Sequence, residues 1–162
     1  MIVISDSTPI ISLIKIECLD VLEKLYKNII IPKAVYNELI INVDYQDEID
    51  IIKGCTFLEI KNVEENLSVL LLQRQLKLDF GESEAIVLAN NINADLIIID
   101  EQKARRIAKD IGLKVTGTLG ILVEAKQQGL IEELKPLLDK LIDNNIRISK
   151  KLYIEILNIV GE

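Results

Sequence analysis

The sequence predicts an α/β protein with a central parallel sheet that helices cover on both faces, in three layers. Short apolar runs alternate with segments of helical spacing along the chain, which is the pattern of a parallel sheet with connecting helices. Two of these runs, residues 2–4 and 96–99, are apolar at every position. Such runs are typical of strands that are buried on both faces of a parallel sheet.

The first half of the chain contains three predicted strands, each followed by helical spacing. The opening strand covers residues 2–5, and a helix over residues 10–16 follows, with Pro9 at its first position behind a Ser or Thr cap. A β-branched run at residues 28–31 stops at Pro32. The other predicted elements of this half are helices over residues 19–26, 33–41, 47–53 and 67–76 and a strand over residues 56–60.

The second half continues the alternation. The small and aliphatic residues 85–89 predict a helix that packs closely on the sheet, and its acidic first turn favours the positive end of the helix dipole. Strands are predicted over residues 96–99 and 114–115, and helices over residues 102–111, 116–128, 131–142 and 151–159. We therefore predict a single domain over residues 1–162, with the helices from about residue 131 to 162 appended to its core.

The composition excludes several classes of enzyme. The chain has no histidine, which excludes a Ser-His-Asp triad, a His/Cys zinc site and a paired-histidine ribonuclease. A net charge of -7 argues against broad non-specific adhesion to nucleic acid, although carboxylates that hold a dication are less negative once loaded. Cys18 and Cys55 lack metal-site spacing and are expected to be small buried hydrophobes. Because no leader and no membrane-length apolar run is visible, we expect a cytoplasmic protein with no membrane partner.

Acidic residues stand where a parallel sheet would gather them. Asp6 and Asp100 each end a predicted strand, and the carboxyl ends of parallel strands meet at one edge, where ligands bind. Glu82 and Glu84 reach this edge if their helix begins in a loop above the sheet, and Glu38 approaches from the flank. Grouped carboxylates repel one another unless a cation screens them. The pattern therefore predicts a Mg²⁺ or Mn²⁺ site that polarises a phosphodiester and activates water.

Each of these carboxylates also has a purely structural explanation. Asp6 or Asp100 alone would cap the helix that follows it. Glu38 alone would be a solvated helix residue, and two glutamates at a helix start would stabilise the helix dipole only. The joint pattern, rather than any single acid, carries the prediction of a site.

The order and spacing of several motifs resemble those of PIN-domain nucleases. The motifs are DSTPxI after the first strand, the helix of Glu38, GESEAIxLA, IIID and TGTLGIL, and they cover residue 2 to about residue 130. The closest likeness is to a PIN-like branch of unknown function found beside toxin-antitoxin genes. In two places the chain departs from the pattern: glutamate stands where many members have aspartate, and Ile99 precedes the last acid, where a polar residue is common.

The resemblance implies a PIN fold and a metal-dependent ribonuclease. Its catalytic acids would be Asp6, Glu38, Glu84 and Asp100, and the Mg²⁺ or Mn²⁺ ligands would be Asp6, Glu84, Asp100 and Glu82. The family pattern places its third acid before a small and an aliphatic residue, which Glu84 matches better than Glu82. Thr8 resembles the hydroxyl that helps to hold the metal-bound water, or else caps the helix before Pro9.

Basic and hydroxyl residues beside these acids are candidates for RNA contacts. Lys103, Arg105 and Arg106 lie on the helix directly after Asp100, and the alternative explanation is an ordinary solvated helix face. Thr116 and Thr118 flank a glycine at a helix start, where backbone N–H groups bind phosphate or form a tight turn and cap.

The resemblance further implies an RNA substrate, a cognate antitoxin protein and a homodimer, with toxicity as the biological role. The apolar C-terminal helix offers a surface for such contacts, or it packs on its own domain. The alternative function is that of a non-catalytic PIN-like protein for RNA binding or assembly. A phosphatase with a strand-end aspartate is disfavoured because Thr8 stands where its second acid belongs, and a receiver domain because its paired acids and later lysine cannot be placed. A Rossmann module is disfavoured because no glycine-rich turn follows the first strand.

Overall fold

Parallel strands form one sheet at the centre of the computed structural model, which describes residues 1–42, 46–64 and 66–162. The described strands lie in the order β3-β2-β1-β4-β5, and every neighbouring pair is parallel. Their bounds are β1 (Val3–Ser5), β2 (Ile29–Pro32), β3 (Leu58–Lys61), β4 (Leu96–Ile98) and β5 (Val115–Thr116). The predicted apolar runs therefore form the middle of the sheet.

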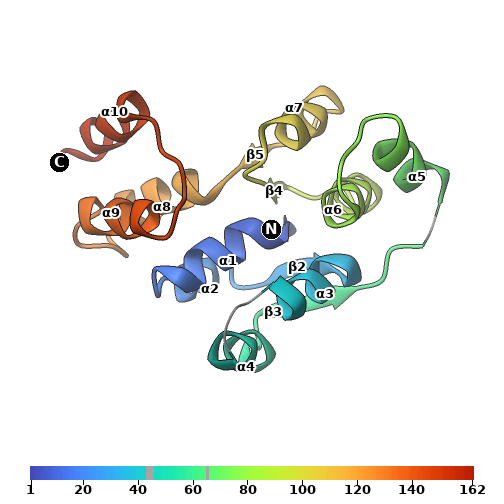
Figure 1. The fold of residues 1–162 in the computed structure, drawn as a ribbon, viewed down its shortest axis with the longest axis horizontal. Helices are drawn as coiled ribbons and strands as arrows, with labels where there is room; N and C mark the ends of the chain where they lie inside the picture. Colours follow the sequence, from blue (N-terminus) through green and yellow to red (C-terminus); the bar gives the residue numbers. More distant parts are fainter. Residues whose placement is uncertain (43–45, 65) are drawn as a thin grey trace.

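Helices cover both faces of this sheet (Figure 1). Side chains that alternate along the strands enter two separate cores: Ile98 packs with α1, α2, α8 and α9, whereas Ile97 and Ile99 pack with α6 and α7. The three-layer α/β/α prediction is thus confirmed. The helices are α1 (Ser7–Lys15), α2 (Asp20–Tyr26), α3 (Lys33–Asn42), α4 (Gln46–Gly54), α5 (Leu67–Arg74), α6 (Phe80–Asn91), α7 (Gln102–Asp110), α8 (Thr118–Gln127), α9 (Lys135–Asp143) and α10 (Lys150–Val160).

The strand order creates a topological switch point between β1 and β4. From β1 the chain moves outward through β2 and β3, and it then crosses to the other side of β1 to form β4 and β5. At the carboxyl end of this pair, the Asp6 amide donates a hydrogen bond of 2.9 Å to the Ile98 carbonyl. Ligands of open α/β sheets bind at such a point, because the loops there diverge and leave a crevice.

Some helices begin at residues other than those expected. Helix α1 starts at Ser7, with Asp6 as its extended N-cap residue, so Pro9 occupies the third position and not the first. Proline is tolerated there because first-turn N–H groups have no partner within the helix. Helix α9 starts at Lys135 instead of residue 131, and Pro136 stands in its first turn.

The C-terminal helices pack on the domain rather than projecting from it. Leu138 and Leu141 of α9 and Ile156 of α10 belong to the same core cluster as α1 and α8. Figure 1 shows α8, α9 and α10 on one side of the molecule, with α5, α6 and α7 on the other. Among the described residues, no helix combines the length and apolar character needed to cross a bilayer.

Candidate active site

Asp6 is the buried acid at the switch point. Its side chain accepts no capping hydrogen bond from α1, and its Oδ1 atom is buried without a partner among the described residues. Burial above all, together with the nearby carboxylates of Asp79, Glu38 and Glu82, raises the Asp6 pKa to about 7, and the Ser7 amide opposes this rise. The Asp6 side chain therefore does not form the capping hydrogen bond that the capping explanation requires, although the Ser7 amide lowers its pKa.

Glu38 reaches the same region from α3, as expected, and two donors hold its carboxylate. The Ser7 hydroxyl donates to Oε2 at 2.7 Å, and the Gly81 amide donates to Oε1 at 3.1 Å. Burial raises the Glu38 pKa, and Asp79 raises it further, whereas the hydrogen bonds from Ser7 and Gly81 lower it. A Cβ atom at position 81 would lie 2.7 Å from Glu38 Oε2, so a larger residue there would displace the Glu38 carboxylate.

Glu82 forms a capping box with Asp79 at the start of α6. The Glu82 amide donates to Asp79 Oδ1 at 2.7 Å, and the Asp79 amide donates to Glu82 Oε2 at 3.1 Å. Burial raises the Glu82 pKa, partly opposed by that amide, and Asp79, Glu101 and Glu38 raise it further. Sequence reasoning missed Asp79, although an aspartate three residues before a glutamate and an apolar run is the capping-box pattern.

Glu84 is buried on the same helix but contacts a different element. Its Oε2 atom accepts a 3.1 Å hydrogen bond from the Ala34 amide in the first turn of α3, directly after β2. The carboxylate thus lies at the correct edge of the sheet. The carboxylates that act on the Asp6 pKa are those of Asp79, Glu38 and Glu82. The Asp6 pKa therefore responds to Glu82, and the Glu84 carboxylate is hydrogen-bonded at the start of α3.

Asp100 follows β4 and is bound by the start of α8. The Thr118 amide donates to Oδ1 at 2.7 Å, and the Thr118 hydroxyl donates to Oδ2 at 2.6 Å. Helix α7 is capped by Glu101 instead, whose carboxylate accepts from the Ala104 amide at 2.7 Å. The expectation that Asp100 would cap the next helix is therefore replaced by a contact with a helix 18 residues away.

The residues expected to contact RNA have different surroundings. Lys103 and Arg106 are exposed on α7, whereas Arg105 is half-buried and donates from Nη1 to the Ile99 carbonyl at 2.8 Å. Thr116 is half-buried at the end of β5, and the Thr118 side chain is buried against Asp100. Thr8 is exposed at the second position of α1.

The acids thus form two neighbouring parts. Asp6 is electrostatically coupled to Glu38, Asp79 and Glu82, and Asp100 is fixed by Thr118. Within the described residues, no three acidic or cysteine side chains lie close enough to hold a metal ion as they stand. The donor chemistry nevertheless fits a hard dication at Asp6, because an unpaired carboxylate oxygen among like charges is stabilised by a cation.

Comparisons with known proteins identify the family. No curated protein matches the chain. The family model DUF3368, a PIN domain, matches residues 2–162 and so extends over α9 and α10, past the last motif. With nearly the whole chain matched, this protein belongs to the PIN domain family.

Proposed function

We propose that this protein is a metal-dependent ribonuclease that hydrolyses RNA phosphodiester bonds with metal-activated water. PIN domains are generally nucleases and typically use divalent ions, which supports the coarser part of this proposal. The observation that carries the finer part is the buried, unpaired Oδ1 of Asp6 at the switch point, where the Asp6 amide is bonded to Ile98, two residues before Asp100. Mg²⁺ or Mn²⁺ bound there would polarise the phosphodiester and lower the pKa of a water molecule.

The chain's own residues would hold and orient these groups. Asp6 is the proposed primary ligand, because its oxygen has no other partner among the described residues. Glu38 and Asp100 are proposed catalytic acids whose carboxylates are already oriented, by Ser7 and Gly81 and by Thr118 respectively. Preorganised ligands reduce the cost of assembling a charged site.

The third acid is proposed to be Glu82 or Glu84. The family pattern favours Glu84, whereas the electrostatic coupling with Asp6 favours Glu82. The variants Glu82→Gln and Glu84→Gln distinguish these two candidates. Only the substitution of the residue that binds the metal should weaken Mn²⁺ binding, by tenfold or more, which is roughly the effect of losing one charged oxygen donor.

The central test is Mn²⁺-dependent cleavage of labelled RNA by purified protein. Asp6→Asn and Asp100→Asn should each lower kcat by about 100-fold or more, with circular dichroism unchanged. Asp110→Asn, an exposed aspartate at the end of α7, is the matched control and should cleave normally. Undiminished cleavage by both the Asp6→Asn and Asp100→Asn variants, or full cleavage in the presence of a chelator, would contradict the assignment of a metal-dependent active site.

A non-catalytic role in RNA binding or assembly is the alternative. The observation that favours it is that no three acids of the described residues are close enough to share an ion. RNA binding without cleavage in Mg²⁺, Mn²⁺ or any other divalent ion would establish this alternative.

Biological context is proposed from the family resemblance. It comprises an RNA target, a cognate antitoxin protein, a homodimer, a toxin role and a cytoplasmic location. Co-expression with the product of the neighbouring gene, followed by sedimentation of the purified complex, tests the two protein partners directly. A chain that stays monomeric and captures no neighbour would contradict both.

A further inference from the structure

A groove of about 430 Å³ lies beside Asp100, between helices α8 and α10. One end is polar and contains Asp100, Arg105 and Gly117. The other end is aliphatic and is formed by α8 and by Leu152, Ile156 and Ile159 of α10. The volume is in the range of small-molecule sites in proteins. Because Asp100 lines it, the groove adjoins the candidate active site.

The polar end holds the Arg105 guanidinium, which has donors to spare, near the Asp100 carboxylate. Arg105 is half-buried and donates one hydrogen bond, to a backbone carbonyl. Among the residues that the structure describes, its guanidinium forms no ion pair within 4 Å. Asp100 already accepts two hydrogen bonds from Thr118. A guanidinium has five N–H donors, and their planar arrangement suits a phosphate group.

The aliphatic end presents one face of α10 to the groove. Leu152, Ile156 and Ile159 are spaced four and three residues apart, so they share a face of the helix. Leu152 is 39 % exposed and Ile159 is 56 % exposed, whereas Ile156 is buried. The flat face of a nucleobase packs against apolar side chains, and the chain has little aromatic surface for stacking.

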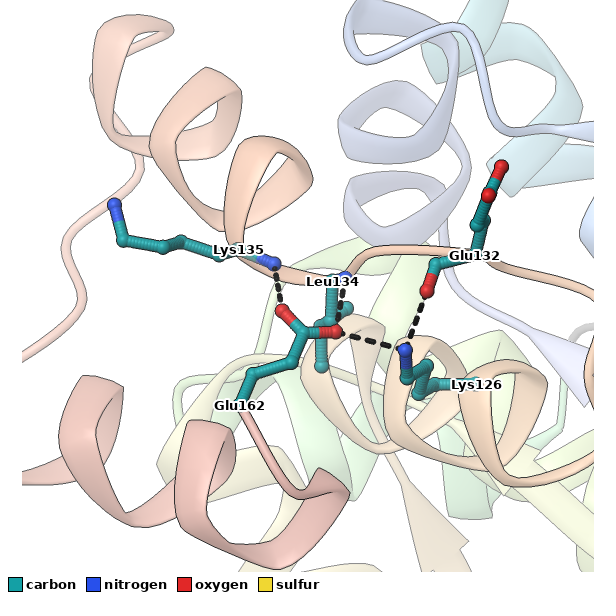
Figure 2. Close-up of polar contacts among 5 residues, drawn as sticks. All are labelled: Lys126, Glu132, Leu134, Lys135 and Glu162. Carbon is teal, nitrogen blue, oxygen red and sulfur yellow. Dashed lines mark hydrogen bonds and ion pairs between the residues drawn. The ribbon is translucent and has the colours of Figure 1, made fainter.

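A cluster of polar contacts, here named the Glu162 clamp, holds this wall in place (Figure 2). The Glu162 carboxylate accepts hydrogen bonds from the Leu134 and Lys135 amides at 2.7 and 2.8 Å, and it pairs with Lys126 at 2.9 Å. Lys126 also donates to the Glu132 carbonyl. Since Lys126 belongs to α8 and Leu134 precedes α9, the clamp ties the end of α10 to both helices, and the groove is preformed.

We propose that this groove is a nucleotide subsite of the ribonuclease. Arg105 binds a backbone phosphate next to the scissile one, and the adjoining nucleoside packs against the aliphatic wall of α10. The proposal rests on the proposed function, because the groove matters to catalysis only if Asp100 belongs to the site. The free guanidinium donors of Arg105 and the continuity of the groove with Asp100 favour a nucleotide over a protein segment.

The test places a negative charge on the wall and on the opposite face of the same helix. Leu152→Glu and Ile159→Glu alter the groove, and Ile154→Glu, at a position 48 % exposed and outside the groove, is the matched control. Anisotropy of a labelled single-stranded RNA, measured in the Asp6→Asn background, should show about tenfold weaker binding for the groove variants only. Each variant must keep an unchanged circular dichroism spectrum. Because Ile159 is the more exposed position, Ile159→Glu should fold even if Leu152→Glu does not.

Cleavage of abasic substrates gives the second readout. The unsubstituted protein should discriminate by about tenfold against an abasic nucleotide at one position flanking the scissile bond. Leu152→Glu should lose this discrimination, and Ile154→Glu should keep it. Equal RNA binding by all three variants would overturn the subsite. It would also be overturned if the groove variants lost only self-association, because the occupant of the groove would then be a second copy of the chain. RNA binding that depends on Leu152, without any cleavage, would retain the subsite and reject the proposed nuclease.

Discussion

Thr118 donates both of its hydrogens to Asp100, the backbone amide to Oδ1 at 2.7 Å and the hydroxyl to Oδ2 at 2.6 Å. Thr118 is 3 % exposed and Asp100 is half-buried, so this contact is partly buried. The first turn of α8 therefore sets the orientation of an acid that follows β4. An RNA contact by Thr118 remains a prediction, but in this structure its hydroxyl is used within the protein.

Thr118→Val should weaken the proposed metal site without removing a ligand. The isosteric valine keeps the amide donor but leaves Asp100 Oδ2 without its hydroxyl partner, and the loss of such outer contacts typically costs about 10–100-fold in metal affinity or activity. Mn²⁺ titration and cleavage rates provide the measurement. Thr118→Ser should restore both values, and Thr56→Val, at an exposed threonine, should change neither. Equal Mn²⁺ affinities for the valine and serine variants would contradict this role.

Asp6 should make the metal-free protein less stable as pH rises. Its folded pKa of about 7 exceeds the ordinary aspartate value of 3.8, so between these values the folded state binds the extra proton. The stabilising contribution is therefore complete below pH 4 and is lost as pH rises toward 7, at up to about 1.4 kcal/mol per pH unit.

Urea unfolding in a chelator at pH 5, 6, 7 and 8 measures this dependence. The asparagine of Asp6→Asn cannot ionise, so the free energy of unfolding of this variant should fall less steeply over the same pH range. Its stability relative to the unsubstituted protein should therefore increase from each pH value to the next. Parallel pH profiles for the two proteins would mean that Asp6 ionises normally in the fold.

Gly81→Ala should destabilise the protein although alanine is the better helix former. A Cβ atom at this first-turn position would lie within 3 Å of the Glu38 carboxylate, which the Gly81 amide binds. We expect a loss of about 1–3 kcal/mol in urea unfolding, together with reduced Mn²⁺ affinity. Gly54→Ala is the control, since nothing lies within 4 Å of its Cβ position, and this change should be neutral or slightly stabilising.

Glu162→Gln should loosen α10, because the clamp loses its charge. Hydrogen bonds from Leu134, Lys126 and Lys135 lower the Glu162 pKa to about 2, so the clamp's contribution is present above the usual glutamate pKa and is lost as pH falls through about 2. Faster amide hydrogen exchange in α10 at pH 7 is the expected result. Glu155→Gln, at an exposed position of the same helix, should exchange like the unsubstituted protein.

The sequence by itself determined the elements and the class of fold. The apolar runs before Asp6 and Asp100 predicted β1 and β4 to within one residue at each end, because burial on both faces favours apolar residues along a strand. The parallel arrangement then brought both acids to one edge of the sheet. These inferences depend on local periodicity, which a short stretch of sequence contains in full.

Only the tertiary structure decided which groups meet at that edge. The strand order placed β1 beside β4 and created the switch point, and packing directed Glu84 to the Ala34 amide while Glu82 joined the acids around Asp6. It also gave Asp100 its partner Thr118, where local reasoning expected a cap of the next helix. Such contacts join residues far apart in the chain, and they depend on how helices and strands pack, which no local pattern encodes.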